Sequence, residues 1–299
     1  GKVVSAAINK YVYVHLKRHD PLFQEKYRVS YSQIEYADNR NEIQNGIARS
    51  CLELLDIDEP LQISTSADIP ASSGLGSSSS FAVALLLGLH ELLGEHPSAA
   101  QLAEEAAHVE MTMLKAPIGK QDQYSAAFGG LNQYIFEKNE RVTIKPLPLS
   151  DEIVKNFFGN SLLIWTEESR SASVVLKDQQ QNKESNLMGL IELTKLVDRF
   201  TDVLLAKSLD SFQLGSLIKQ GWDIKKKFST LISTAQSEKI FALLESNDSL
   251  GYKLLGAGGG GFVYSIFGQE ILKILPKFSE WKTFIPSLDN AGARVASLI

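Results

Sequence analysis

Two glycine-rich segments, far apart in the chain, carry the residue types that most directly suggest chemistry. Residues 70–80 read Pro-Ala-Ser-Ser-Gly-Leu-Gly-Ser-Ser-Ser-Ser, and residues 256–261 read Gly-Ala-Gly-Gly-Gly-Gly. A glycine run that opens a helix leaves backbone N–H groups unpaired at the positive end of the helix dipole, which favours an anion. Serine hydroxyls beside those N–H groups can reach phosphate oxygens or a metal ion bound to phosphate. The first segment therefore predicts a protein that handles phosphate.

The flanking residues give this first segment the context of a phosphate-binding loop. Residues 61–69 alternate as in a half-buried strand, which Pro70 ends, and Phe81–Leu93 is apolar on every side, as expected of a buried helix. The N–H groups at the start of that helix would point into the loop. The segment lacks the Lys of the P-loop pattern, does not fit the dinucleotide-binding glycine pattern, and contains no Gly-x-Ser-x-Gly elbow of a hydrolase.

Two carboxylates further along the chain stand out by their surroundings. Periodicity predicts a helix over residues 101–115, and Glu110 falls on its apolar side, where a charge is costly unless a cation or hydrogen-bond donor meets it. Asp122 follows within Gly119-Lys120-Gln121-Asp122-Gln123-Tyr124. On sequence alone Asp122 can cap a short helix or take part in a reaction, and Lys120 offers a cation in either case.

Composition sets wide limits on what the protein does. The chain has 299 residues, is 44% hydrophobic and 22% charged, and carries a formal net charge of -5, which disfavours nucleic acid or an anionic membrane as a partner. The single cysteine, Cys51, is expected in the core and allows no internal disulfide, and the histidines lack the spacing of zinc ligands. No secretory signal or membrane-spanning run is visible, so we expect a cytoplasmic protein.

The remaining pattern predicts strands and helices in two parts. Residues 12–17 and 27–31 are expected to pair as antiparallel strands across a turn at Asp20-Pro21. After residue 148 the chain changes character, with amphipathic helices that lead to the second glycine segment and a strand directly after it. The expected helices are 41–55, 186–206, 210–228, 237–246 and 269–278, and the expected later strands are 162–165, 262–267, 283–285 and 294–299.

In this order and context, the two glycine segments resemble those of the GHMP kinase superfamily, which includes galactokinase, homoserine kinase and mevalonate kinase. The family's phosphate loop, Pro-x-x-x-Gly-Leu-Gly-Ser-Ser-[Ala/Ser], matches residues 70–79 at every defined position, and its C-terminal glycine loop matches residues 253–262. The resemblance implies an α+β GHMP kinase fold of two domains with mixed sheets and helices. The N-terminal half, 1–158, would be ribosomal-protein-S5-like, and the C-terminal half, 159–299, ferredoxin-like.

By the same resemblance the chain is a kinase that uses ATP and Mg²⁺. Asp122 matches the aspartate that faces the acceptor hydroxyl, with Lys120 nearby, whereas Ser78 and Glu110 match the residues that hold Mg²⁺. Gly258, Gly259 and Gly260 would lie close to the acceptor and the phosphates. The residues expected to hold the triphosphate are Pro70, Ser73, Gly74, Leu75, Gly76, Ser77, Ser78 and Ser79.

Within the superfamily the chain looks most like the D-glycero-D-manno-heptose 7-phosphate kinases, which implies that the acceptor is the anomeric C1 hydroxyl of a small phosphosugar. Arg170 would then meet the acceptor's own phosphate, or else form an ordinary surface ion pair. Thr166-Glu167-Glu168 departs from the usual Thr-Gly, and the superfamily's N-terminal basic motif is expected before Gly1. The segments that carry this resemblance are 9–11, 38–43, 119–124, 128–132 and 169–172.

Other functions remain open at this stage. The acceptor could be fucose, galactose or an isoprenoid alcohol, or the chain could be a sugar or nucleotide sensor that kept the fold without catalysis. Asp122, together with Glu110 and Ser78, favours a kinase, because a sensor has no need of the aspartate. A homodimer is one expectation for the assembly, which the sequence does not fix.

Overall fold

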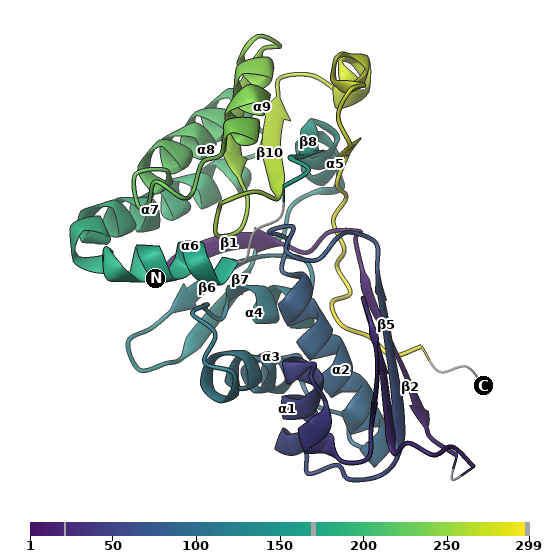
Figure 1. The fold of residues 1–299 in the computed structure, drawn as a ribbon. Helices are drawn as coiled ribbons and strands as arrows, with labels where there is room; N and C mark the ends of the chain where they lie inside the picture. The colour runs from purple at the N-terminus through teal and green to yellow at the C-terminus, as the bar shows by residue number, and fades with distance from the viewer. Residues whose placement is uncertain (21, 169–171, 297–299) are drawn as a thin grey trace. The chain divides into compact units, whose positions relative to one another are not determined.

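The computed structural model describes residues 1–299 except 21, 169–171 and 297–299, and the chain divides into two compact units (Figure 1). Unit 1 comprises Gly1–Asn9, Ser72–Leu75 and Gly130–Asp289. Unit 2 comprises Lys10–Ala71, Gly76–Gly129 and Asn290–Ile299. Both units are discontinuous in sequence, so no single position separates them. The predicted domain boundary between residues 158 and 159 stays a prediction.

Unit 2 is built on a four-stranded sheet with the order β2-β5-β3-β4. Strand β5 pairs antiparallel with β2 and parallel with β3. The expected antiparallel pair of residues 12–17 with 27–31 is therefore wrong: β5 lies between the two strands, because its fully buried Leu61 and Ile63 make it the central strand. In sheet order the strands span Val12–Arg18, Leu61–Ala67, Tyr27–Ser30 and Ile34–Ala37.

The helices of unit 2 lie on one face of this sheet, with α2 alongside β2 (Figure 1). Fully buried leucines of α2 fill the core, as the all-round apolar pattern predicted. Near the C-terminal end of α2, the ring nitrogens of His90 lie 2.6 Å from Glu95 Oε2 and 2.7 Å from Glu105 Oε2. Burial by itself would lower the pKa of His90. The hydrogen bonds to Glu105 and Glu95 outweigh this effect, so the pKa of His90 is raised. The helical segments are η1 (Arg40–Glu42), α1 (Gly46–Leu54), α2 (Ser77–Leu93), α3 (Ala99–Ala107), η2 (His108–Met113) and α4 (Gln121–Phe128).

Unit 1 contains two antiparallel sheets, β1-β6-β7 and β11-β8-β10-β9. The helix expected over residues 269–278 is instead two short 3₁₀ turns, because Pro276 cannot continue an α-helix. Of the strand expected over 294–299, residues 294–296 are not in a strand and the rest lie outside the described residues. The strands are β1 (Lys2–Ala6), β6 (Leu131–Phe136), β7 (Val142–Pro146), β8 (Ser161–Trp165), β9 (Ser249–Leu254), β10 (Phe262–Phe267) and β11 (Thr283–Phe284).

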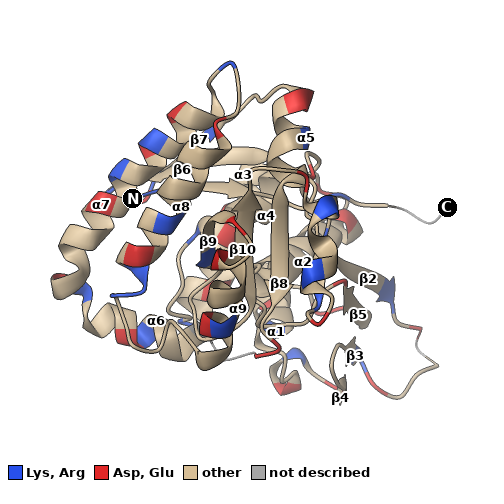
Figure 2. Ribbon diagram, turned by 90° about the horizontal axis from the view of Figure 1, so that it is seen from above, with Lys and Arg blue, Asp and Glu red and all other residues tan. Residues whose placement is uncertain are grey.

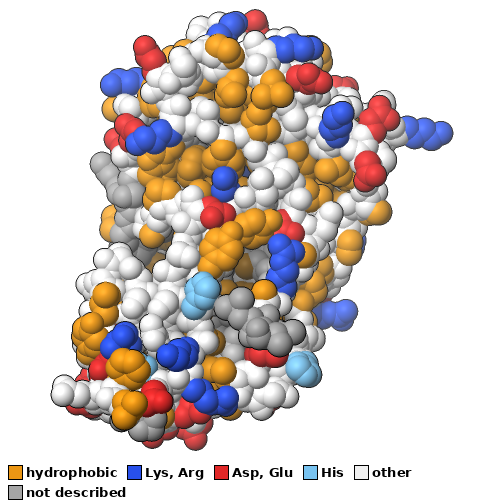
Figure 3. Space-filling model, turned by 90° about the vertical axis from the view of Figure 1, so that its right-hand side faces the viewer, with side chains coloured by type: hydrophobic (Ala, Val, Ile, Leu, Met, Phe, Trp, Pro, Cys, Tyr) orange, Lys and Arg blue, Asp and Glu red, His pale blue; other side chains and the backbone are white. Residues whose placement is uncertain are grey.

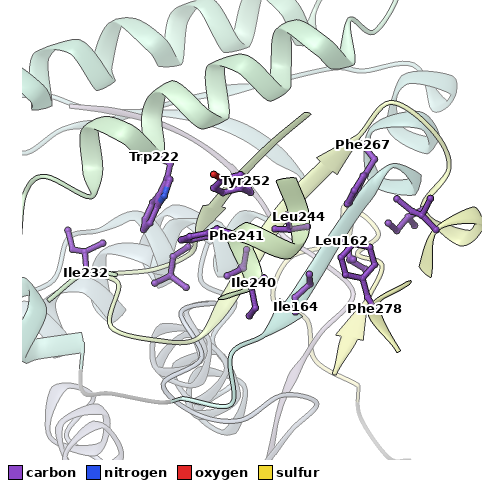
Figure 4. Packing of buried hydrophobic residues seen from close by; sticks show 14 of the residues in the cluster. Leu162, Ile164, Trp222, Ile232, Ile240, Phe241, Leu244, Tyr252, Phe267 and Phe278 are labelled. Atoms are coloured by element: carbon purple, nitrogen blue, oxygen red, sulfur yellow. The ribbon is translucent and has the colours of Figure 1, made fainter. Parts of the chain in front are cut away.

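Helices α7, α8 and α9 follow one another beside β9 and β10 (Figure 1). An apolar cluster joins them to the sheet: Phe241 stacks on Tyr252 with ring centroids 4.7 Å apart, and Trp222 lies 5.2 Å from Phe241 (Figure 4). The expected helices over 186–206, 210–228 and 237–246 are therefore confirmed within a few residues. The helical segments of unit 1 are α5 (Asp151–Gly159), α6 (Ala172–Gln181), α7 (Lys183–Leu204), α8 (Ser211–Lys225), α9 (Ala235–Glu245), η3 (Ile271–Lys273) and η4 (Leu275–Phe278).

Charges of both signs alternate along the exposed sides of α7 and α9 (Figure 2). On the face drawn in Figure 3, Lys and Arg side chains also stand among Asp and Glu side chains. Within the described part of the chain, no helix combines the length and apolar character needed to cross a membrane.

Candidate active site

The N-terminus of α2 provides unpaired backbone donors in unit 2. Gly76 occupies the N-cap position in a left-handed conformation, with φ +71°, and no described side chain caps the helix. The N–H groups of the first turn therefore lack the side-chain acceptor that caps α1, α3, α5, α8 and α9. The buried Oγ atom of Ser77 has no hydrogen-bond partner in the described part of the chain either. Unpaired N–H groups and a hydroxyl at the positive end of a helix dipole suit a phosphate.

Glu110 is a buried carboxylate that faces this helix start. Its side chain is 3% exposed, and three neutral donors meet it: Ser78 Oγ lies 2.6 Å from Oε1, whereas Ser79 Oγ and Gln123 Nε2 lie 2.7 Å and 2.6 Å from Oε2. Among the described residues, no Lys, Arg or His pairs with Glu110. The donors lower the cost of burial, but no cationic side chain of the described residues compensates the negative charge.

A change of helix type occurs where Glu110 sits. The regular helix expected over 101–115 is α3 followed by a π-helical turn, η2, in which Leu114 N donates to Val109 O at 3.0 Å. Val109 and Glu110 remain buried in this wider turn. Such turns are rare and are found frequently at functional sites. The π-turn therefore sets the position from which Glu110 reaches Ser78 and Ser79.

Asp122 lies directly against Gly76. A Cβ atom placed on Gly76 would be 3.1 Å from Asp122 Cβ and Cγ and 3.3 Å from its Oδ2. Asp122 is exposed and occupies the first turn of α4, whose N-cap position belongs to Lys120. Asp122 is therefore not the N-cap residue of α4, because Lys120 occupies that position. Instead, the Asp122 carboxyl group lies at the N-terminus of α2.

Gly76→Ala is expected to lower kcat by at most about 10²-fold, because a Cβ at this position would shift Asp122 by a few tenths of an ångström, and a misplacement of about 1 Å costs about 10²-fold. The left-handed backbone would also cost about 1–2 kcal/mol of stability. The control is Gly94→Ala at the other end of α2, which has φ +75° and no atom within 4 Å of the added Cβ. Thermal melts should show similar losses for both variants, and steady-state kinetics should show the large defect in Gly76→Ala alone. If Gly76→Ala and Gly94→Ala were equally active, the contact between Gly76 and Asp122 would have no role in the reaction.

Lys120 and Tyr124 fasten α4 to α3 through Glu104. Lys120 Nζ lies 3.0 Å from Glu104 Oε2, and the Tyr124 hydroxyl donates to Glu104 Oε1. Burial and the bond to Glu104 raise the pKa of Tyr124. The charge of Lys120 is thus shared with Glu104, and its expected catalytic role stays a prediction.

The oxygen ligands near α2 fit a small, hard cation. The described residues hold no group of three His, Cys, Asp or Glu that could bind a metal by themselves. Mg²⁺ does not require one, since it keeps several waters and is held by one or two carboxylates together with substrate phosphates. The Glu110 carboxylate and the Ser78 hydroxyl offer such ligands, and the uncompensated charge of Glu110 matches a cation. Cys51 is a core residue as expected, and burial together with the Glu110 charge raises the pKa of its thiol.

The second glycine segment packs against the first half of the phosphate-type loop within unit 1. A Cβ on Gly256 would lie 2.6 Å from Gly74 Cα, and one on Gly261 would lie 2.4 Å from Ser73 O. Phe262 N donates to Ser73 O at 3.1 Å. Ser73 is 1% exposed, and its buried Oγ has no hydrogen-bond partner within residues 1–296 outside the gaps at 21 and 169–171. Two segments nearly 200 residues apart in sequence are thus joined backbone to backbone, and they leave a second unpaired hydroxyl.

The sequence also predicted substrate contacts for Gly258, Gly259, Gly260 and Arg170. Gly259 N donates to Ile232 O at 2.8 Å, and a Cβ on Gly260 would lie 2.6 Å from Glu168 O. These glycines, like Gly258, serve close backbone packing, while their expected approach to substrate stays a prediction. Arg170 lies outside the described residues.

Sequence reasoning missed Gln123. The residue is fully buried and bonds Glu110, although it stands next to Asp122 in the segment singled out above. The helical pattern could have indicated its burial, because a residue one position after an exposed Asp lies on a different side of the helix, here the side that faces the core.

Two domains of one known protein family match the segments that contain these residues. Residues 42–130 match the GHMP kinases N terminal domain, which includes the α2 start, Glu110 and Asp122. Residues 205–281 match the GHMP kinases C terminal domain, which includes the second glycine segment.

Individual relatives agree with the family match. A D-glycero-alpha-D-manno-heptose 7-phosphate kinase of Campylobacter jejuni is 30% identical over 88% of this chain and 80% of its own length. A bifunctional fucokinase/GDP-fucose pyrophosphorylase of Arabidopsis thaliana is 28% identical over 68% of this chain but only 19% of its own length. Among solved structures, a D-glycero-D-manno-heptose 1-phosphate kinase from Bacteriodes thetaiotaomicron is similar with a TM-score of 0.78, at 20% identity, over 99% of this chain and 91% of that one.

Proposed function

This chain belongs to the GHMP kinases and is an ATP-dependent sugar kinase, and from that premise we propose that it phosphorylates the anomeric C1 hydroxyl of D-glycero-D-manno-heptose 7-phosphate. The observation that carries the proposal is the arrangement in unit 2, where the Asp122 carboxyl group lies against Gly76 at the unpaired N-terminus of α2. The charged acceptor is favoured by the relative from Campylobacter jejuni, which is a heptose 7-phosphate kinase.

The N-terminus of α2 would hold the anionic end of ATP. The first-turn N–H groups and the Ser77 hydroxyl are donors without partners among the described residues, so a phosphate oxygen can accept from each of them without displacing a bond seen there. Transfer of a phosphoryl group passes through a loose transition state with charge spread over its oxygens. Fixed donors aimed at those oxygens lower the barrier because they need no reorganisation during the reaction.

Glu110 and Ser78 would hold Mg²⁺, which neutralises charge on the phosphate oxygens when bound. Ser78 Oγ donates its proton to Glu110 Oε1 and keeps its oxygen lone pairs for a cation. Ser79 and Gln123 keep the other carboxylate oxygen in place.

Asp122 would orient the attacking hydroxyl and accept its proton. The C1 oxygen forms a bond to the γ-phosphorus, the bond from that phosphorus to the β–γ bridging oxygen breaks, and ADP leaves with that oxygen. The proton of the C1 hydroxyl goes to an Asp122 carboxylate oxygen. An anomeric hydroxyl is more acidic than an ordinary alcohol, so an exposed aspartate is a sufficient base.

A second candidate is a kinase for an unphosphorylated sugar such as fucose, which the relative from Arabidopsis thaliana supports. Arg170 discriminates the two in principle, since a guanidinium pairs with phosphate. The cytoplasmic location and the homodimer expected from the sequence stay predictions.

The test is an acceptor panel with the full-length protein, Mg²⁺ and ATP. ADP release should be fastest with heptose 7-phosphate, and phosphorus NMR should show a new phosphate at C1. Faster turnover of fucose or galactose would replace the proposed acceptor. Tight ATP binding with no turnover of any acceptor would identify a sensor instead of a kinase.

A further inference from the structure

Gln123 combines three features that set it apart from an ordinary core residue. Its side chain is fully buried, its Nε2 donates to Glu110 Oε2 at 2.6 Å, and its Oε1 is buried with no partner among the described residues. If the amide were flipped, Gln123 Oε1 would face the Glu110 carboxylate oxygen, and two acceptors would repel each other. The bond to Glu110 therefore determines that Oε1 is the atom without a partner.

An unpaired amide oxygen in the core costs free energy. A methionine has nearly the same volume and shape as glutamine and would fill this space without leaving a buried acceptor. If the position served packing alone, an apolar side chain would therefore be the better choice. The bond to Glu110 is the one polar contact that the structure gives the Gln123 side chain within the described residues, and it accounts for an amide at this position.

The bonds to Glu110 are distributed unequally over its two oxygens. Oε2 accepts from Ser79 and Gln123, both buried, so both of its lone-pair directions are used. Among the described residues, Oε1 accepts from Ser78 alone, a residue exposed to solvent. One lone pair of Oε1 is thus left for a further ligand.

The backbone links this arrangement to the other carboxylate of the site. Asp122 and Gln123 are consecutive in the first turn of α4, and they point to different partners: Asp122 to Gly76 and Gln123 to Glu110. One turn of helix thus sets the position of both acidic side chains.

We propose that Gln123 is a positioning residue, which holds the plane of the Glu110 carboxylate so that Oε1 stays available to the metal ion. The proposal rests on the function proposed above, since it assigns Gln123 a task in that same metal site. It concerns binding before any chemistry, so it can be tested without turnover.

The experiment is calorimetric titration of ADP into full-length protein over a series of Mg²⁺ concentrations. Parent protein should bind ADP more tightly as Mg²⁺ rises. In Gln123→Met, the Mg²⁺ concentration that gives half of this effect should increase about 10- to 100-fold, the usual effect of losing a residue that orients a metal ligand. The affinity for ADP without Mg²⁺ should not change, and the melting temperature should stay near that of the parent.

The matched control is Gln101→Met, because Gln101 donates to Glu105 at 2.8 Å but lies exposed on α3. It should keep the parent's response to Mg²⁺. If Gln123→Met does not fold, Gln123→Asn carries the test, since asparagine keeps an amide that is too short to reach Glu110.

The outcomes separate this inference from the function it rests on. A parent-like response to Mg²⁺ in Gln123→Met, with the response lost in Glu110→Gln, would overturn the role of Gln123 and leave the metal site intact. A response that persists in Glu110→Gln would overturn both. A weakened response in the two variants, with Gln101→Met unchanged, supports the positioning role.

Discussion

Asp122→Asn is expected to lower kcat by about 10²- to 10⁴-fold, the range that a general base contributes, with nucleotide affinity close to that of the parent. Asparagine keeps the size of the side chain and its contact with Gly76 but does not accept a proton. The affinity persists because the α2 start that would hold the phosphates is unchanged. Steady-state ADP release and calorimetric ADP titration measure the two quantities separately.

The control for this variant is Asp56→Asn, an exposed aspartate of unit 2 that pairs with Arg40 at 3.2 Å. Its φ of +48° is a conformation that asparagine adopts readily, so it should fold and work as the parent does. Full turnover in Asp122→Asn would remove Asp122 from the mechanism. An equal loss in both variants would show that the effect comes from charge in general.

Glu110→Gln should lower kcat/KM by about 10²- to 10³-fold, as the loss of one electrostatic group in an active site does. The substitution removes the charge that matches a cation. It also turns an amide N–H₂ toward one of three groups that already donate to this position: Ser78, Ser79 and Gln123. The variant should therefore need much more Mg²⁺ for activity, which kinetics over a Mg²⁺ series measures.

Glu53→Gln provides the comparison, because Glu53 is exposed on α1 and its side chain makes no polar contact with any described residue. Circular dichroism melts of both variants distinguish a lost metal ligand from a lost fold. If Glu110→Gln retained the parent's activity and Mg²⁺ requirement, the carboxylate would have no function beyond packing.

The features of this site that could be predicted from the sequence depend on residues close to one another in the chain. The strand before Pro70, the buried helix after the serine run and the isolated charge of Glu110 each follow from periodicity and the cost of burying charge. The helix ends differed by a few residues, since caps and not apolar patterns decide them.

The parts that escaped prediction depend on contacts between distant segments. Residues 12–18 and 27–30 pair with β5 rather than with each other, and this depends on a strand that lies more than 30 residues later in the chain. The π-turn at Glu110 widens a helix whose sequence fits a regular one. Gln123 has no local signature, because its role comes from the carboxylate that lies 13 positions earlier in the chain.

A crystal structure with a non-hydrolysable ATP analogue and Mg²⁺ would show directly whether the start of α2 and Glu110 form the nucleotide and metal site. We expect phosphate oxygens on the N–H groups of Ser77, Ser78 and Ser79, and a metal ion that contacts Glu110 Oε1 and Ser78 Oγ. A triphosphate bound elsewhere, with the start of α2 facing only solvent and Glu110 still held by its three donors alone, would contradict this expectation.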